Sequence, residues 1–316
     1  MREMAQWLAA RDDIVVLGHR APDGDACGSC IAVAMCLRAL GKRACACLPG
    51  GVPEYLRFLP GQECLAEAGN LPFAPQTALA VDVSSPDMLA QYRALFEACP
   101  HRAVLDHHQS NPLFGQVNCV QPGSAAAGEL ALALIEALGV ALTREMATCI
   151  FAAVCSDTGN FNFSNTTAEA FEAAATCVRA GADVDEITGR IFRTRTQART
   201  RLLGMALSSL RFDGRMAWTS VTNQMFAACG AQRSDTERIV NYLAEIEGAQ
   251  VAVLAIEQEG GASTKFSLRS VAPYDVARDV AQPLGGGGHE RAAGVTIALP
   301  LEEALAKVLD RARKML

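Results

Sequence analysis

The chain has 316 residues, of which half are hydrophobic and a fifth are charged, and this predicts two globular domains and excludes a disordered protein. Its net charge of -6 argues against a binder of long nucleic acid, which needs a broad basic surface. No apolar run reaches the roughly 18 residues that cross a bilayer, and MREMAQWLAARDD lacks the apolar core of a signal peptide, so we expect a cytoplasmic protein without membrane contact.

The first 189 residues alternate short apolar stretches with longer helical ones. Strands are expected at Ile14–Leu17, Ala44–Leu48, Ala78–Val81 and Ala103–Leu105. Helices are expected at Cys27–Leu40, Gly128–Leu138 and Arg144–Val154. Such alternation predicts an α/β domain, 1–189, with a parallel sheet flanked by helices.

A polar stretch, 190–205, is predicted to be a linker helix. Its cations are Arg190, Arg193, Arg195, Arg199 and Arg201. Charge runs of this kind are usually solvated, although one or two of these arginines reaching a substrate phosphate stays an open alternative.

The remaining residues, 206–316, predict a smaller α/β domain with a mixed sheet. Strands are expected at Met216–Val221, Ala249–Ile256, Thr264–Ser270 and Val295–Ala298, and helices at Asp235–Leu243 and Pro273–Val280. We expect the active site in the cleft between the two domains.

Acidic and imidazole side chains follow the predicted strands of the first domain. His19, Asp82 and Asp106 each come directly after a strand, and the ends of parallel strands meet at one edge of a sheet. Asp23 and Asp25 share the turn that follows His19, and two carboxylates held together repel each other unless a cation lies between them. Helix capping is the alternative for each lone aspartate.

The sequence Asp106-His107-His108 is more specific, because an acid and two histidines in a row cannot all be buried cheaply. Asp157, in CSDTGNF, is ambiguous by itself, because Ser-Asp-Thr-Gly is also an ordinary turn sequence. Cys27-x-x-Cys30 matches a redox pair, but buried reduced thiols are the simpler interpretation for a cytoplasmic chain.

Four motifs of the first domain, GHRAPDGDACGS, AVDVSS, VLDHHQSN and AVCSDTGNF, resemble those of the DHH phosphoesterase superfamily, in the expected order. GGGGHERAAG resembles the signature of its DHHA1 companion domain. Within the superfamily, the chain is most similar to the nanoRNase and pAp phosphatase group. This resemblance implies the fold, a two-metal centre and phosphoester hydrolysis by an activated water.

The resemblance also implies a role for each residue. His19, Asp23 and Asp82 would hold one metal ion. A second ion would be held by a set that shares Asp82, namely Asp25, Asp82, His107 and Asp157. Asp106 would orient a neighbouring side chain, and His108 would face the phosphate being cleaved. Mixed imidazole and carboxylate ligands favour Mn²⁺ for both ions, with Co²⁺, Fe²⁺ and Mg²⁺ as alternatives.

The second domain would bind substrate through Arg269, whose guanidinium suits a phosphate, and through His289 with the glycines before it, Gly286, Gly287 and Gly288. A glycine run is otherwise an ordinary loop, and an exposed strand arginine is equally ordinary. Tyr274 and Phe161 could stack on a base, although the sequence does not place either of them.

The expected substrates are oligoribonucleotides of a few residues and 3′-phosphoadenosine 5′-phosphate (pAp). The sequence does not fix the oligomeric state, and analogy alone suggests a homodimer. A phosphodiesterase for cyclic di-AMP or pApA is the alternative within the superfamily. A family-II inorganic pyrophosphatase shares the first domain's pattern, but GGGGHERAAG counts against it. A non-catalytic nucleotide-binding protein would tolerate missing metal ligands, and none is missing.

Overall fold

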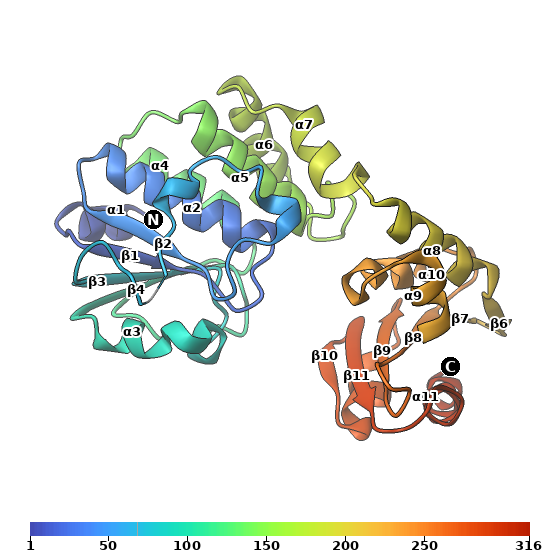
Figure 1. The fold of residues 1–316 in the computed structure, drawn as a ribbon. Coiled ribbons are helices and arrows are strands. Elements are labelled where there is room, and N and C mark those ends of the chain that lie inside the picture. Colours follow the sequence, from blue (N-terminus) through green and yellow to red (C-terminus); the bar gives the residue numbers. More distant parts are fainter. Residues whose placement is uncertain (68) are drawn as a thin grey trace. The chain divides into compact units, whose positions relative to one another are not determined.

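In the computed structural model the chain forms two compact units, Met1–Thr194 and Arg195–Leu316, and residues 1–67 and 69–316 are described (Figure 1). The boundary lies inside the segment 190–205. The first unit ends in a π-helix, η4 (Gly189–Arg193), and the second begins with α8 (Gln197–Ser208). Leu202 and Ala206 of α8 are buried, so this helix belongs to the core of the second unit.

The first unit is built on a five-stranded sheet in which every strand pair is parallel. Its strands are β1 (Ile14–Leu17), β2 (Ala44–Cys47), β3 (Thr77–Val81), β4 (His101–Asp106) and β5 (Val117–Val120), in the order β2-β1-β3-β4-β5. This confirms the predicted parallel sheet. The chain passes from β1 to β2 on one side of β1 and then returns to place β3 on its other side, so the strand order switches between β1 and β3. Ligands of open α/β sheets bind at such a switch point.

Helices cover both faces of this sheet, as Figure 1 shows. The helices that cover it are α1 (Arg2–Ala9), α2 (Gly24–Ala39), α3 (Arg93–Ala98), α4 (Ala127–Ala137) and α5 (Arg144–Asp157). Two further helices, α6 (Ala168–Arg179) and α7 (Val184–Thr188), pack on α5. The sheet has a hydrophobic core on each face, and successive residues of a strand point into one core or the other. Val16 packs with α1, α2, α4 and α5 on one face, and Val15 packs with α3 on the other.

Helix α2 begins three residues before the predicted start because Asp23 caps it. The Asp23 side chain accepts hydrogen bonds from the backbone N–H groups of Asp25 and Ala26, at 3.0 and 3.1 Å. Short 3-10 helices join the strands elsewhere, namely η1 (Glu54–Leu56), η2 (Gln62–Cys64) and η3 (Pro86–Tyr92).

The second unit carries a six-stranded mixed sheet, which confirms the predicted fold class. Its strands are β6 (Arg211–Asp213), β7 (Met216–Val221), β8 (Val251–Glu257), β9 (Thr264–Ser270), β10 (Gly287–His289) and β11 (Ala292–Ile297), in the order β10-β11-β9-β8-β7-β6. Only the β7–β8 pair is parallel. One face packs on α8, α9 (Asn223–Cys229) and α10 (Ile239–Ala244), and the other on α11 (Leu301–Met315).

Two predicted helices of this unit differ from the structure. The segment Asp235–Leu243 is split into η5 (Arg233–Thr236) and α10, because Arg238 between them adopts a left-handed backbone with φ 67°. The segment Pro273–Val280 contains helix only from Ala277, in η6 (Ala277–Ala281), which is followed by η7 (Gln282–Leu284).

Among the described residues, no helix combines the length and the apolar character that a membrane span requires. Cys27 and Cys30 are both free and fully buried, and burial raises the pKa of each thiol. A thiol held protonated is a poor nucleophile, so these two residues are packing elements of α2 rather than a redox pair.

Candidate metal centre

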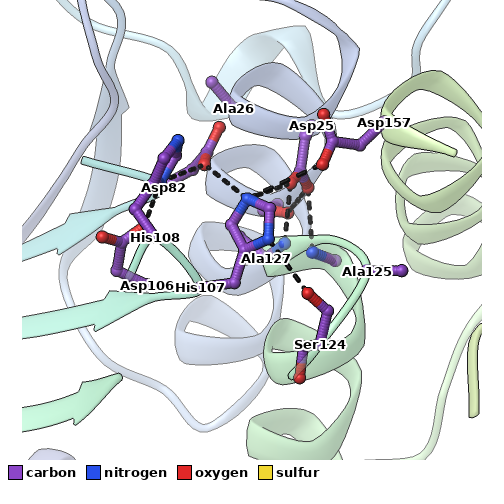
Figure 2. A network of polar contacts seen from close by, with 12 residues as sticks. Asp25, Ala26, Asp82, Asp106, His107, His108, Ser124, Ala125, Ala127 and Asp157 are labelled. Carbon is purple, nitrogen blue, oxygen red and sulfur yellow. Dashed lines mark hydrogen bonds and ion pairs between the residues drawn. The ribbon is translucent and has the colours of Figure 1, made fainter. Parts of the chain in front are cut away.

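Six predicted ligands gather at the carboxyl ends of β1, β3 and β4. His19 follows β1, Asp82 follows β3, and His107 follows β4. Asp23 and Asp25 lie at the start of α2, whereas Asp157 is the last residue of α5. Helix α5 thus ends inside the segment in which the sequence suggested a turn, and the turn itself follows at residues 158–160. Figure 2 shows Asp25, Asp82, His107 and Asp157 converging on a common point.

His19, Asp23 and Asp82 form one potential ligand group. The Nε2 atom of His19 lies 3.8 Å from Oδ1 of Asp23 and 3.4 Å from Oδ2 of Asp82. Nδ1 of His19 is occupied by the carbonyl oxygen of Arg20, at 2.8 Å. The ring therefore presents Nε2 to the centre, as a histidine ligand does when its other nitrogen is held by an acceptor.

Asp25, His107 and Asp157 form a second potential ligand group beside the first. The Nε2 atom of His107 lies 3.8 Å from Oδ2 of Asp25, 3.7 Å from Oδ2 of Asp157 and 3.5 Å from Oδ1 of Asp82. Nδ1 of His107 contacts the carbonyl oxygen of Ser124 at 3.1 Å, which leaves Nε2 for the centre (Figure 2).

Asp82 lies between the two groups. Its Oδ2 atom faces His19 and its Oδ1 atom faces His107, so each carboxylate oxygen belongs to a different group. The side chain is almost fully buried, and Oδ1 has no hydrogen-bond partner among the described residues. The backbone of Asp82 is left-handed, with φ 57°, an uncommon conformation for a residue other than glycine. A buried carboxylate oxygen without a donor is suited to a cation.

The centre shifts the pKa values of its own members. Burial opposes protonation of His19 and His107, but the facing carboxylate of Asp82 and, for His19, that of Asp23 raise their pKa values to about 11 and about 10. Burial raises the pKa of Asp157 to about 6. Burial works in the same direction on Asp82, but the neighbouring His107 and His19 rings, 3.5 and 3.4 Å away, hold its pKa well below the usual range. Carboxylates this crowded require compensating positive charge, and the mixed oxygen and imidazole donor set fits divalent metal ions.

Asp25 has a structural partner that sequence reasoning did not find. Its carboxylate accepts hydrogen bonds from the backbone N–H groups of Ala127 and Gly128, at 2.6 and 2.9 Å, and from Oγ of Ser29 at 3.0 Å. The start of α4, whose N-cap residue Ala126 offers no side-chain acceptor, is thus capped by a residue of α2. Burial, with the charges of Asp82 and Asp157, raises the pKa of Asp25.

His108 belongs to a third potential ligand group, with Asp82 and His107, and its Nδ1 atom lies 3.7 Å from Oδ1 of Asp82. Asp106 lies beside this group. Nδ1 of His108 donates a hydrogen bond to Oδ1 of Asp106 at 2.8 Å, and the side chain of Asp106 is fully buried. The other oxygen of Asp106, Oδ2, accepts a hydrogen bond from Nδ2 of Asn111 at 2.6 Å. Asn111 lies within the VLDHHQSN motif, but its residue type alone gave no reason to single it out.

In the second unit, Arg269 and His289 lie on the same face of the sheet. Ala292 of β11 pairs with Arg269 of β9 on one side and with His289 of β10 on the other. Directly opposed residues project to the same face, so the two side chains are about 10 Å apart across two strand spacings. Among the described residues, no carboxylate lies within ion-pairing distance of Arg269, whose Nη1 donates to the carbonyl oxygen of Leu268 at 3.0 Å. Burial lowers the pKa of Arg269.

The glycines before His289 have different structural requirements. A Cβ atom at Gly286 or Gly288 would overlap the carbonyl oxygen of Gly294 or of Ala292 on β11. A Cβ at Gly287 would meet open space. The close approach of β11 therefore explains why residues 286 and 288 are glycines. At Gly287 no neighbouring atom requires glycine, and its backbone is left uncovered.

The family models match both units. Residues 13–154 match the DHH family, N-terminal domain, and residues 222–316 match the DHHA1 domain. The chain is 34% identical over 321 residues to the "Bifunctional oligoribonuclease and PAP phosphatase NrnA" of Thermus thermophilus, covering 100% of this chain and 94% of that relative.

Two further similarities bear on function and fold. The chain is 24% identical over 311 residues to the "Cyclic-di-AMP phosphodiesterase GdpP" of Geobacillus thermodenitrificans, covering 90% of this chain but 45% of that protein. An exopolyphosphatase-related protein from Bacteroides fragilis has a crystal structure that superposes with a TM-score of 0.92 at 25% identity, covering 99% of this chain and 95% of that one.

Proposed function

Because this chain belongs to the DHH family and is a phosphoester hydrolase, we propose that its substrates are short oligoribonucleotides and pAp. The relative from Thermus thermophilus is named for both activities, and its similarity extends over the whole of this chain. The structural observation that supports phosphoester hydrolysis at a two-metal centre is the position of Asp82, whose Oδ2 atom faces His19 and whose Oδ1 atom faces His107.

We propose that these groups hold two divalent cations, with Mn²⁺ as the native ion because of the mixed imidazole and carboxylate donors. His19, Asp23 and Asp82 would hold one ion, and Asp25, Asp82, His107 and Asp157 the other. Such ions, when bound, stabilise charge on phosphoryl oxygens and activate a water molecule for in-line attack.

The chain's own contribution beside the ions is His108. Asp106 accepts a hydrogen bond from the Nδ1–H group, so Nε2 is the atom through which His108 can donate a hydrogen bond to a phosphoryl oxygen. The hydrogen bond to Asp106 raises the pKa of His108, which favours the protonated ring that makes such a donation. A donor aimed at developing negative charge lowers the barrier of phosphoryl transfer.

Arg269, His289 and the backbone at Gly286, Gly287 and Gly288 are proposed to bind the end of the substrate that is not cleaved. Support comes from the shared sheet face of Arg269 and His289 and from the unpaired guanidinium. A guanidinium without a carboxylate partner is available for a phosphate.

A cyclic di-AMP or pApA phosphodiesterase is the second candidate, favoured by the similarity to GdpP. A panel assay with Mn²⁺ separates the two: di- to pentaribonucleotides, pAp, pApA, cyclic di-AMP and pyrophosphate are compared in one buffer. We expect turnover of the short RNAs and pAp that chelator abolishes. Turnover confined to cyclic di-AMP and pApA would establish the second candidate, and turnover confined to pyrophosphate would reject both.

The expected homodimer and the cytoplasmic location remain part of the proposal. Analytical ultracentrifugation of the purified chain tests the assembly, and cell fractionation tests the location.

A further inference from the structure

We propose that Asn111 is a positioning residue for phosphoester hydrolysis, and that it acts through Asp106 on His108. This inference rests on the proposed function, because it concerns the same reaction. It adds a residue to the machinery that neither binds a cation nor touches the phosphate.

Asn111 uses every polar atom of its side chain. Nδ2 donates to Oδ2 of Asp106 at 2.6 Å and to the carbonyl oxygen of Val83 at 3.0 Å. Oδ1 accepts the backbone N–H of Leu113 at 2.8 Å. A carboxylate and a carbonyl can only accept, and an N–H can only donate, so the orientation of the amide is unambiguous. Only an amide supplies two donors and one acceptor in this arrangement.

The contact with Asp106 fixes the carboxylate that holds His108. Asp106 is fully buried, and its two oxygens are divided between two partners, Oδ2 for Asn111 and Oδ1 for His108. Without the amide, Oδ2 would be a buried acceptor with no donor, which is unfavourable. The carboxylate would then turn toward another donor, and Nδ1 of His108 would lose its fixed acceptor.

The contact with Val83 connects this pair to the shared carboxylate. Val83 directly follows Asp82 at the end of β3, whereas Asn111 lies in the loop that follows β4. One amide therefore joins the loop that carries Asp82 to the loop that carries His107 and His108. This fixes the position of His108 relative to the candidate metal centre.

The same amide supports a strained backbone at Leu113. Leu113 has φ 57° and its side chain is 57% exposed, and its N–H is held by Asn111. Loss of Asn111 could therefore act on this loop instead of on His108. The experiment must separate these two effects.

The first measurement compares Asn111→Ala with Asn118→Ala in the Mn²⁺-loaded enzyme. Asn118 is the matched control, because its amide also bridges backbone groups, in both directions with Gly115, but contacts no member of the centre. We expect kcat of Asn111→Ala to fall about 10- to 100-fold, the usual range for a supporting hydrogen-bond partner, with unchanged metal content. We expect Asn118→Ala to keep the wild-type kcat.

A double-mutant cycle with His108→Ala decides the route. If Asn111 acts through His108, the double variant is as slow as His108→Ala alone, because the side chain to be positioned is gone. If Asn111→Ala acts instead through the loop around Leu113, the fold-losses in kcat of the two single variants multiply in the double variant. This result would overturn the inference. If Asn111→Ala fails to fold, Asn111→Ser, which keeps one donor and one acceptor, takes its place in the same cycle.

A second readout does not depend on activity. This readout is the NMR spectrum of metal-free protein, prepared with chelator and labelled with ¹⁵N at histidine. We expect the Nδ1–H signal of His108, which reports a ring protonated at Nδ1, to be lost in Asn111→Ala and kept in Asn118→Ala. An unchanged signal in both variants would contradict the inference. The cycle is run on whichever phosphoester the wild type cleaves, with bis(p-nitrophenyl) phosphate included. Inactivity on RNA and pAp would thus reject the proposed substrates, whereas a multiplicative cycle would reject the role of Asn111.

Discussion

The Oδ1 atom of the fully buried Asp106 lies 2.8 Å from Nδ1 of the half-buried His108. We therefore expect Asp106→Asn to lower kcat about 10- to 100-fold. An amide lacks the negative charge that favours the protonated ring of His108. Its N–H group can also turn toward Nδ1–H, so that two donors face each other. The measurement is kcat, with metal content determined by mass spectrometry. Asp87→Asn, an exposed carboxylate paired with Arg93, is the control and should behave as wild type. Loss of metal by Asp106→Asn would show that Asp106 holds an ion instead.

Removing the carboxylate of Asp82, which lies between the two ligand groups, should lower kcat more than Asp106→Asn does. Asp82→Ala is expected to abolish turnover of every substrate, because each group loses one oxygen ligand. Titration with Mn²⁺ by calorimetry should show weakened binding at both positions. Asp87→Ala serves as the control for a general change in charge. Substantial residual turnover, or loss of one ion only, would contradict the shared role of Asp82.

Arg269→Ala should separate substrate binding from metal binding. We expect KM for short RNA and pAp to rise about 10-fold or more, the scale of a lost charge-assisted hydrogen bond, while the metal content stays as in wild type. Arg313→Ala is the matched control, because Arg313 is an exposed arginine of the same unit that pairs with Asp213. A variant that loses metal as readily as Asp82→Ala would show that the two roles are not divided between the units.

Chelated protein should lose stability as the pH rises. The folded pKa values of His19 and His107, about 11 and about 10, exceed the ordinary value of 6.5. These groups therefore stabilise the fold fully below pH 6.5, and the contribution is lost as the pH rises through 10 to 11. Metal-loaded protein should escape this loss, because neutral imidazoles are then ligands and binding releases protons.

The measurement is Tm from pH 6.5 to 10, with EDTA and with Mn²⁺. We expect the difference between the two curves to widen with pH. His19→Gln should flatten the EDTA curve, whereas His101→Gln should leave it unchanged, because His101 lies beside Trp7, away from the centre. An EDTA curve that rises toward pH 10 would show that these histidines are not protonated in the folded chain.

The parallel sheet could be predicted because its strands are continuous apolar runs, as strands covered on both faces must be. Strand β5 was missed because VNCV is a short, mixed sequence at the sheet edge, and backbone pairing with β4 defines it rather than a pattern. Helix α11 was missed although its signal was present: Leu305, Val308, Leu309 and Ala312 are buried at helical spacing.

The gathering of strand-end residues could be anticipated from the topology of parallel sheets, but the supporting contacts could not. Asp25 and the N-terminus of α4 are separated by about a hundred residues, and no local pattern joins them. Asn111 is an ordinary loop residue by type, and only the structure shows its contact with Asp106. The role of Asp157 was ambiguous from sequence, because Ser-Asp-Thr-Gly suits a loop turn as well as the end of a helix.

Three glycines allow the backbones of α2, α4 and α5 to touch. A Cβ at Gly28 would overlap the carbonyl oxygen of Cys149, a Cβ at Gly24 would crowd Ser156, and one at Gly128 would press on Ala153. Asp25 belongs to α2 and Asp157 to α5, so the close approach that these glycines permit helps to set the distance between the two carboxylates.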